Sequence, residues 1–238
     1  MTGQYDLVVI GACIHGAGAA QAAAAAGYSV LVLEQAGIAS ATSCRSSKLI
    51  HGGLRYLESG QFNLVRESLC ERDILLRIAP QLVRLVPFHI PVYRHSVRRP
   101  WQIRAGLSLY AVLGNLRRHA WFAALPRSQW GGLDGLATEN LQAVFRYQDA
   151  QTDDAALTRA VMHSAQSLGA ELVVPGELLA AQRTANGYVV RYRTPQGEAE
   201  SHCTALVNAA GPWINIVLAR ITPRVSPAAI ELVQGTHI

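Results

Sequence analysis

The chain opens with a short apolar run, and a second such run follows about twenty residues later. Residues 5–10 (YDLVVI) and 29–34 (SVLVLE) are apolar and rich in β-branched side chains, which predicts two buried strands. Between them, the alanine-rich residues 17–26 predict a helix that Gly27 ends in a C-cap position. Apolar strands on both sides of a crossover helix indicate a βαβ unit in a parallel sheet.

Three later segments show the apolar spacing of a helix: residues 61–79, 101–119 and 152–169. The last is expected to begin at an N-cap of Thr152 or Asp153 and to end at Gly169. The middle one is amphipathic. Its apolar side carries Ile103, Leu107, Tyr110 and Leu113, and its polar side carries Arg104, Ser108 and Asn115.

The remaining patterns predict strands. PFHIPVY (87–93) reads as one strand, and residues 170–193 read as short strands around a hairpin turn at Asn186-Gly187. CTALVNAAG (203–211) is a buried strand that runs into a glycine turn, and LVQGTHI (232–238) has the pattern of a further strand. A βαβ unit, intervening material and a returning strand together predict an α/β nucleotide-binding domain that is interrupted by insertions.

The composition fits a folded chain with anionic partners. Half of the 238 residues are hydrophobic and 16% are charged, a balance that excludes a disordered segment. The net charge of +5 favours phosphorylated small molecules, acidic lipid or nucleic acid. The sequence has no recognised nucleic-acid-binding module and its aromatic residues are not arranged for base stacking, so no nucleic acid is expected as a partner.

Cysteine and histidine positions argue against a metal site. The four cysteines form no CxxC pair, and the eight histidines show no HxxxH or HxH spacing. Scattered cysteines are typical of reduced thiols in a cytosolic protein. No basic region precedes the first apolar run, and no stretch reaches about 18 uninterrupted apolar residues. We therefore expect a cytoplasmic protein with neither a secretory signal nor a membrane span.

VVIGACIHGAG (8–18) nearly matches the glycine fingerprint of a dinucleotide-binding turn. Gly11 and Gly16 stand at the first and third glycine positions, whereas Cys13 replaces the second, which lets the backbone approach a pyrophosphate. Glu34 follows Gly11 by 23 positions, near the offset of the acid that binds an adenosine ribose. An acid there favours FAD or NAD over NADP. The alternative is an ordinary βαβ unit with a tight turn.

Cys13 is the departure with the clearest physical consequence. A side chain at this position would project toward the diphosphate or force the backbone of the turn to adjust. The sequence therefore predicts that Cys13 decides how well this turn holds a dinucleotide.

A longer motif indicates a family. ATSCRSSKLIHGGLRYLESGQFNLVRE (41–67), taken with VVIGACIHGAG, LVLEQ and VNAAGPW, resembles the FAD-dependent glycerol-3-phosphate dehydrogenases of the aerobic type. These belong to the D-amino-acid-oxidase-like flavoprotein superfamily. The resemblance runs from residue 5 to residue 238, through YQDAQTDDAAL, NAAGPW and QGTHI, and is weakest between about residues 90 and 145.

The resemblance implies a Rossmann-like FAD-binding domain with interrupting insertions and the beginning of a β-rich substrate domain. Residues 1–80 would form the FAD-binding core, 81–145 an insertion that is partly an amphipathic helix, and 146–215 the return to the FAD-binding domain. Residues 216–238 would start the substrate domain and leave it incomplete, because family members continue well past this point.

The resemblance also implies which residues meet the cofactor. Gly11, Cys13, Ile14 and Gly16 would line the FAD diphosphate, Glu34 would bind the adenosine ribose, and the serine-rich loop would run beside the diphosphate and flavin ring. The full expected set is Gly11, Cys13, Ile14, Gly16, Glu34, Gln35, Thr42, Ser43, Ser46, Ser47, Lys48, Leu49, Ala210 and Gly211.

The implied catalytic set is His51, Arg55, Tyr56 and His237. Oxidation of sn-glycerol 3-phosphate to dihydroxyacetone phosphate by hydride transfer to flavin needs a base at the hydroxyl, and a histidine suits that role. Arg55 can bind a phosphate bidentately, and Tyr56 can donate a hydrogen bond. Which of the two histidines takes the proton stays open.

Two other functions stay open beside this one. The first is a different oxidase of the superfamily, acting on an amine or a hydroxy acid. The second is a non-catalytic truncated remnant that binds FAD weakly, which both Cys13 and the early end of the sequence suggest.

An arginine-rich stretch bears on partners. Residues 77–127 hold nine arginines with Trp101 and Trp121 among them, a composition that suits either a solvated basic face or an anionic bilayer surface. The resemblance favours peripheral attachment to the inner face of the cytoplasmic membrane with quinone as electron acceptor. It is also compatible with a homodimer.

Overall fold

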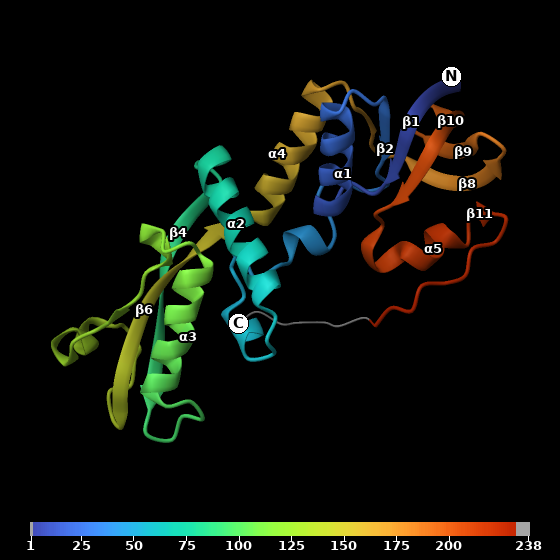
Figure 1. Ribbon diagram of the computed structural model, residues 1–238. Helices are drawn as coiled ribbons and strands as arrows, with labels where there is room; N and C mark the ends of the chain where they lie inside the picture. The colour runs from blue at the N-terminus through green and yellow to red at the C-terminus, as the bar shows by residue number, and fades with distance from the viewer. Residues whose placement is uncertain (1, 232–238) are drawn as a thin grey trace. The chain divides into compact units, whose positions relative to one another are not determined.

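The computed structural model describes residues 2–231, so the expected strand at 232–238 and His237 lie outside the described residues. The chain forms two compact units, which divide between Ser47 and Lys48 and again between Thr152 and Asp153 (Figure 1). Of the described residues, the first unit combines 2–47 with 153–231, and the second is the stretch between them. The domain boundary expected near residue 80 falls inside the second unit, and the one expected near residue 145 falls close to its end. The division into functional domains stays a prediction.

The first unit is built on one seven-stranded sheet with the order β11-β8-β9-β10-β1-β2-β7. Its strands are β1 (Thr2–Ile10), β2 (Val30–Leu33), β7 (Glu171–Val173), β8 (Glu177–Thr184), β9 (Gly187–Thr194), β10 (Gly197–Asn208) and β11 (Ile221–Thr222). β1 pairs in parallel with β2 on one side and with β10 on the other. The predicted βαβ unit with a parallel sheet is therefore confirmed.

β10 belongs to two strand pairings. Its first half pairs antiparallel with β9, and β9 pairs antiparallel with β8, so the predicted hairpin exists. Thr184 pairs with Gly187, which places the turn one residue earlier than expected, at Ala185 and Asn186. Gly187 has φ +135°, and a Cβ there would overlap the carbonyl oxygen of Cys203 on β10. The glycine is required by the neighbouring strand as much as by the turn.

Two helices cover one face of this sheet: α1 (Ile14–Ala25) and α4 (Asp154–Ser167) lie side by side (Figure 1). Their contact is made by small side chains, with Ala17 and Ala20 of α1 in one buried cluster with Met162 and Ala165 of α4. α1 begins three residues earlier than predicted, directly after the glycine turn. A short helix, α5 (Ile214–Leu218), follows β10.

The predicted N-cap of α4 and the glycines predicted to end α1 and α4 are confirmed. Asp153 is the N-cap of α4, and its Oδ1 accepts a hydrogen bond from the backbone N of Ala156 at 2.9 Å. Gly27 and Gly169 follow α1 and α4 with φ of +87° and +99°, the left-handed conformation that glycine adopts most easily.

The second unit packs two helices on an antiparallel sheet whose order is β3-β6-β4, with β5 also paired to β6. The elements are β3 (Leu49–Ile50), α2 (Phe62–Ile78), β4 (Val83–Tyr93), α3 (Pro100–Leu113), β5 (Ala123–Ala124) and β6 (Leu141–Thr152). The predicted strand at 87–93 is the second half of β4. Pro87 and Pro91 are four residues apart and so face the same edge, away from the partner strand β6.

The amphipathic helix predicted at 101–119 is shorter than expected, because α3 ends at Leu113. A Cβ on Gly114 would lie 2.8 Å from the Cβ of Ala120, and the next two residues, Asn115 and Leu116, have φ of +56° and +52°. The chain turns sharply there and cannot continue as a helix. The predicted faces hold within the helix: Leu107 and Tyr110 are buried, whereas Asn115 lies beyond its end.

Candidate functional site

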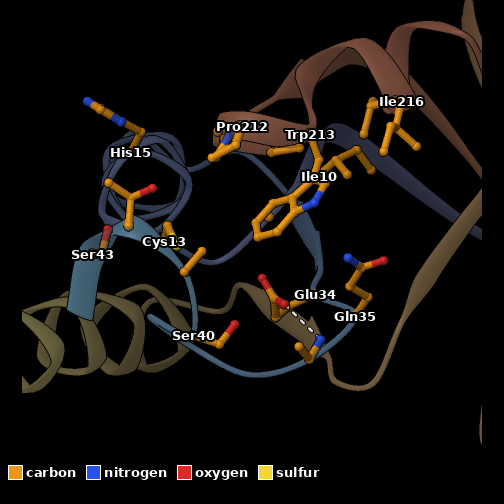
Figure 2. Close-up of a pocket in the computed structure, with 18 of the residues that line it drawn as sticks. Ile10, Cys13, His15, Glu34, Gln35, Ser40, Ser43, Pro212, Trp213 and Ile216 are labelled. Atoms are coloured by element: carbon orange, nitrogen blue, oxygen red, sulfur yellow. Dashed lines mark hydrogen bonds between the residues drawn. The ribbon is translucent and has the colours of Figure 1, made fainter. Parts of the chain in front are cut away.

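A cavity of about 990 Å³ opens in the first unit, outside the carboxyl ends of β1, β2 and β10 (Figure 2). It is lined by Ile10 and Gly11 at the end of β1, by Leu33 and Glu34 at the end of β2, and by residues 209–213 after β10. Helix α1 starts at its rim and connects β1 to β2, whereas β10 lies on the other side of β1. Ligands of open parallel sheets bind in such crevices, where the connections diverge to opposite sides.

The turn between β1 and α1 depends on two glycines for steric reasons. Gly11 has φ +102°, and a Cβ there would lie 2.8 Å from the carbonyl oxygen of Ala209. A Cβ on Gly16 would overlap the carbonyl oxygen of Gly11. These are the roles of the first and third glycines of a dinucleotide fingerprint, a tight turn and close packing of the helix on the strand.

Cys13, at the second fingerprint position, is the N-cap residue of α1 and lies at the cavity wall (Figure 2). Its φ of −77° and ψ of −179° are ordinary extended values that any L-residue adopts. The backbone of the turn therefore accommodates a side chain here without strain. Of the two consequences expected from the sequence, only the projection of the thiol at the cavity remains.

Glu34 is a buried carboxylate that connects two turns. It is 7% exposed. Its Oε2 accepts a hydrogen bond from the backbone N of Ala12 at 2.8 Å, and its Oε1 accepts from the backbone N of Ala36 at 2.8 Å and of Gly37 at 3.2 Å. The acid thus holds the glycine turn after β1 against the turn after β2, at the edge of the cavity.

The serine-rich loop is also held to this frame. The backbone N of Ile14, the first residue of α1, donates to Ser43 Oγ at 3.0 Å. Asp154 Oδ2, at the start of α4, accepts from the backbone N of Ser46 at 3.0 Å and from its Oγ at 2.8 Å. Asp154 therefore fixes the serine-rich loop from the first turn of α4, where a negative charge is favourable.

The N-terminus of α1 lies at the cavity rim. The first turn of the helix contains no acidic residue, and its N-cap side chain makes no capping hydrogen bond. Backbone amides at a helix N-terminus and the helix dipole favour an anion at this point. The geometry therefore suits a phosphorylated ligand.

The cavity brings together most of the cofactor residues expected from the sequence. Those that line it are Gly11, Cys13, Ile14, Glu34, Gln35, Thr42, Ser43, Ser46, Ala210 and Gly211. Gly16 lies buried beneath the turn, and Ser47 is exposed and does not line the cavity. Lys48 and Leu49 belong to the second unit.

Sequence reasoning missed part of the wall. His15 and Trp213 line the cavity and lie inside VVIGACIHGAG and VNAAGPW, so the signal for both is local and present in these motifs. Arg220 and Leu178 also line it. Arg220 Nη1 donates to the carbonyl oxygen of Leu178, and Nη2 pairs with Glu177 Oε1 at 3.1 Å, contacts between residues about forty positions apart that no local pattern encodes.

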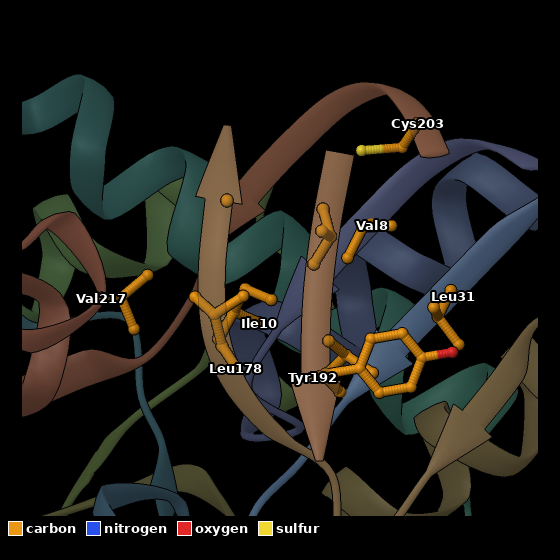
Figure 3. Close-up of a cluster of buried hydrophobic side chains, with 10 residues drawn as sticks. Val8, Ile10, Leu31, Leu178, Tyr192, Cys203 and Val217 are labelled. Atoms are coloured by element: carbon orange, nitrogen blue, oxygen red, sulfur yellow. The ribbon is translucent and has the colours of Figure 1, made fainter. Parts of the chain in front are cut away.

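The cavity rests on the hydrophobic core of the unit. Ile10, Leu33, Leu178 and Val217 line the cavity and also belong to the buried cluster that Figure 3 shows. Behind them pack Val8, Leu31, Val190, Tyr192 and Cys203. Burial raises the pKa of the Cys203 thiol to about 11, so it packs there as a neutral side chain. A close-packed floor keeps the strand ends that carry Gly11 and Glu34 in place.

Three of the four expected catalytic residues lie in the second unit, and the fourth, His237, lies outside the described residues. His51, Arg55 and Tyr56 are exposed, and the two glycines between them, Gly52 and Gly53, are buried. Gly53 has φ +69° and is the N-cap of a short 3₁₀ helix, Leu54–Leu57, that carries Arg55 and Tyr56. The roles of these residues toward a substrate stay a prediction.

Comparison with known proteins gives the following. Residues 6–238 match the family DAO, FAD dependent oxidoreductase. The chain is 41% identical to the glycerol-3-phosphate dehydrogenase of Pseudomonas aeruginosa, over 98% of this chain and 45% of that protein. It is 37% identical to the D-erythritol 1-phosphate dehydrogenase of Brucella abortus, over 98% and 46%. The chain therefore spans less than half the length of these relatives.

Among solved structures, the chain is similar to the glycerol-3-phosphate dehydrogenase from Bacillus halodurans, which was determined in complex with FAD. The TM-score is 0.62 at 25% sequence identity, and the match covers 88% of this chain and 35% of that one.

Proposed function

The chain belongs to the FAD dependent oxidoreductases of the DAO family, and on this basis we propose that it supplies the flavin-binding part of a dehydrogenase that oxidises sn-glycerol 3-phosphate to dihydroxyacetone phosphate. The observation that carries the proposal is the cavity at the start of α1, in a chain 41% identical to a glycerol-3-phosphate dehydrogenase. The basic net charge agrees with a phosphorylated substrate.

The cavity residues fit FAD. The N-terminus of α1, with Gly11 and Cys13, would hold the diphosphate, since the turn glycines bring backbone to the cavity and no acid lies in the first helical turn. Glu34 would bind the adenosine ribose. A carboxylate has about four acceptor sites. Three are used by backbone amides, which leaves one for a ribose hydroxyl. Ser43 and Ser46 would follow the diphosphate toward the flavin.

When bound, FAD supplies the hydride acceptor. The residues of the chain would bind the substrate and take its hydroxyl proton. Arg55 would bind the substrate phosphate through two parallel N–H donors, and Tyr56 Oη would donate a hydrogen bond to the phosphate or hydroxyl. His51, or His237, would take the hydroxyl proton on a ring nitrogen.

The substrate proposal is tested by anaerobic titration of the FAD-loaded chain. We expect sn-glycerol 3-phosphate to bleach the flavin absorbance nearly completely. Glycerol, the matched control without phosphate, should need a concentration about tenfold to hundredfold higher, because it lacks a charge-assisted bidentate contact. Bleaching by glycine or proline, without bleaching by sn-glycerol 3-phosphate, would indicate a different oxidase. A chain that takes up no FAD would support the non-catalytic remnant.

A second substrate is favoured by one specific observation, the 37% identity to a D-erythritol 1-phosphate dehydrogenase. Erythritol phosphate presents the same phosphate and a secondary hydroxyl, so the same residues would serve it. The ratio of kcat/KM for the two polyol phosphates decides between them.

We also propose that α3 docks on an anionic membrane surface, where the reduced protein would pass electrons to a quinone. Trp101 and Val112 lie on the solvent face of this helix and are 70% and 57% exposed, and Val97, just before it, is 90% exposed. Arg99 and Arg104 are exposed beside them. Large apolar side chains among arginines are typical of interfacial helices. In residues 2–231 no helix has the length and apolar character needed to cross a bilayer.

Vesicle co-sedimentation tests this surface. The chain is expected to bind vesicles that contain anionic phosphatidylglycerol and to be released by salt, and Trp101→Ser should weaken binding several-fold. Tyr28→Ser, which removes an exposed aromatic residue of the first unit, is the matched control and should bind normally. Equal binding to neutral vesicles, or no effect of Trp101→Ser, would contradict the proposal. Failure of a quinone analogue to reoxidise the reduced flavin would exclude the acceptor.

A further inference from the structure

A chain of buried hydrogen bonds in the second unit ends at the backbone next to His51. We propose that Tyr110 and Asp149 are positioning residues for the segment 51–56. The inference rests on the proposed function only for the roles of the side chains that this segment carries.

The chain of contacts runs from helix α2 through β6 and α3. Arg72 Nη1 donates to Asp149 Oδ1 at 2.9 Å and to the carbonyl oxygen of Gln148 at 3.3 Å. Tyr110 Oη donates to Asp149 Oδ2 at 3.0 Å, and the backbone N of Gly52 donates to Tyr110 Oη at 2.9 Å. Arg72, Asp149 and Tyr110 are at most 2% exposed, so water does not compete for these contacts.

The hydroxyl of Tyr110 is suited to this double role. Burial, with the charge of Asp149, raises its pKa well above the usual value for tyrosine, so it stays protonated at physiological pH. It therefore always donates to Asp149, and its oxygen remains free to accept from Gly52.

The segment itself has little freedom. A Cβ on Gly52 would lie 2.5 Å from both Tyr110 Oη and Leu69 Cδ2, so only glycine lets the backbone come this close. Gly53 is left-handed, and a Cβ there would lie 2.7 Å from Tyr56 Cε2. The backbone is thus packed against α2 and α3, while the polar side chains of the segment face outward.

The segment 51–56 is connected to strand β6 in two ways. Ile50 of β3 pairs with Ala150 of β6, the residue after Asp149. The segment 51–56 is therefore tied to β6 directly through β3 and, two residues later, through Tyr110. Two attachments so close together fix the direction in which His51 leaves the strand.

Amide exchange in the unsubstituted protein gives the first test. With isotope-labelled glycine, the Gly52 amide is expected to exchange as slowly as the buried amides of β6. Rapid exchange at Gly52 in a folded protein would overturn the proposal. This measurement needs no flavin and no substrate, so it stands whether or not the proposed reaction occurs.

Tyr110→Phe gives the second test. It keeps the ring and removes the hydroxyl, so the Gly52 amide should exchange about tenfold faster. The ring proton signals of His51 should shift, while those of His163 and His202 in the first unit stay in place. In the FAD-loaded protein, kcat for the proposed substrate should fall more than KM changes, because a displaced His51 affects the reacting geometry.

Tyr147→Phe is the matched control. Tyr147 packs edge-on against Tyr110, with ring centroids 6.1 Å apart, and its hydroxyl makes no hydrogen bond within the described residues. The control should leave Gly52 exchange and the His51 signals unchanged. Equal effects of both variants would show a general loosening of the unit and would overturn the positioning role.

Discussion

Replacement of Arg72 by methionine is expected to destabilise the second unit by about 3–5 kcal/mol. Arg72 is fully buried between two carboxylates, with Nη1 at 2.9 Å from Asp149 Oδ1 and Nη2 at 3.5 Å from Asp73 Oδ1. Methionine fills similar space but leaves Asp149, itself 2% exposed, without its charged partner. A buried carboxylate with no compensating charge is among the most costly groups in a protein interior.

Asp73 is less affected, because Arg117 Nη1 at 2.9 Å and His119 Nε2 at 2.7 Å also contact it. The predicted loss therefore comes mainly from Asp149. The arginine forms no hydrogen bond from Nε or Nη2 among the described groups. The intact pair therefore contributes less to stability than is lost when the arginine alone is removed.

Denaturant unfolding measures the effect. Arg66→Met on the same helix removes an exposed arginine and should change the free energy of unfolding by no more than about 0.5 kcal/mol. The double variant Arg72→Met, Asp149→Asn should recover part of the loss, because it removes the isolated charge. A loss below about 1 kcal/mol for Arg72→Met would show that water reaches the carboxylate, contrary to its burial.

Gly16→Ala is expected to weaken FAD binding about a hundredfold, whereas Cys13→Gly should change it by less than about threefold. A Cβ on Gly16 overlaps the carbonyl oxygen of Gly11, a backbone atom that cannot move without displacing the turn. Overpacking of this kind costs up to about 3 kcal/mol. When the turn that would hold the diphosphate is displaced by it, this cost corresponds to a dissociation constant about a hundredfold higher.

The expectation for Cys13→Gly follows from its backbone. With φ −77° the position does not need glycine, so the substitution relieves no strain, and removal of the small thiol from the cavity wall is the only change that acts on binding. Flavin fluorescence titration of the two variants measures the dissociation constants, and far-UV circular dichroism checks that each is folded. A gain of tenfold or more in Cys13→Gly would show that the thiol obstructs the diphosphate, as the sequence suggested.

Much of the first unit was predictable because its determinants are local. Runs such as YDLVVI and SVLVLE are short and β-branched, which favours buried strands, and the alanine-rich segment between them favours a crossover helix. The glycine fingerprint, Glu34 and the serine-rich loop were found from spacing and from resemblance, and most of these residues line one cavity. By contrast, β6 was missed, and the helix at 101–119 was drawn six residues too long, because Asn115 and Leu116 adopt left-handed backbone conformations that the apolar spacing does not indicate.

The sequence by itself determined the class of the protein, through an α/β flavoprotein turn at residues 8–18 and a family-specific loop at 41–67. Both could be recognised because each is specified by residues that are close together in the sequence. Only the tertiary structure decided that Cys13 adopts a conformation open to any residue, that Asp154 holds Ser46 across 108 positions, and that Gly52 meets Tyr110 across 58. The physical reason is that a hydrogen bond between distant residues leaves no periodic trace in either segment. It exists because the sheets and helices bring the two groups together, and burial then makes the contact necessary.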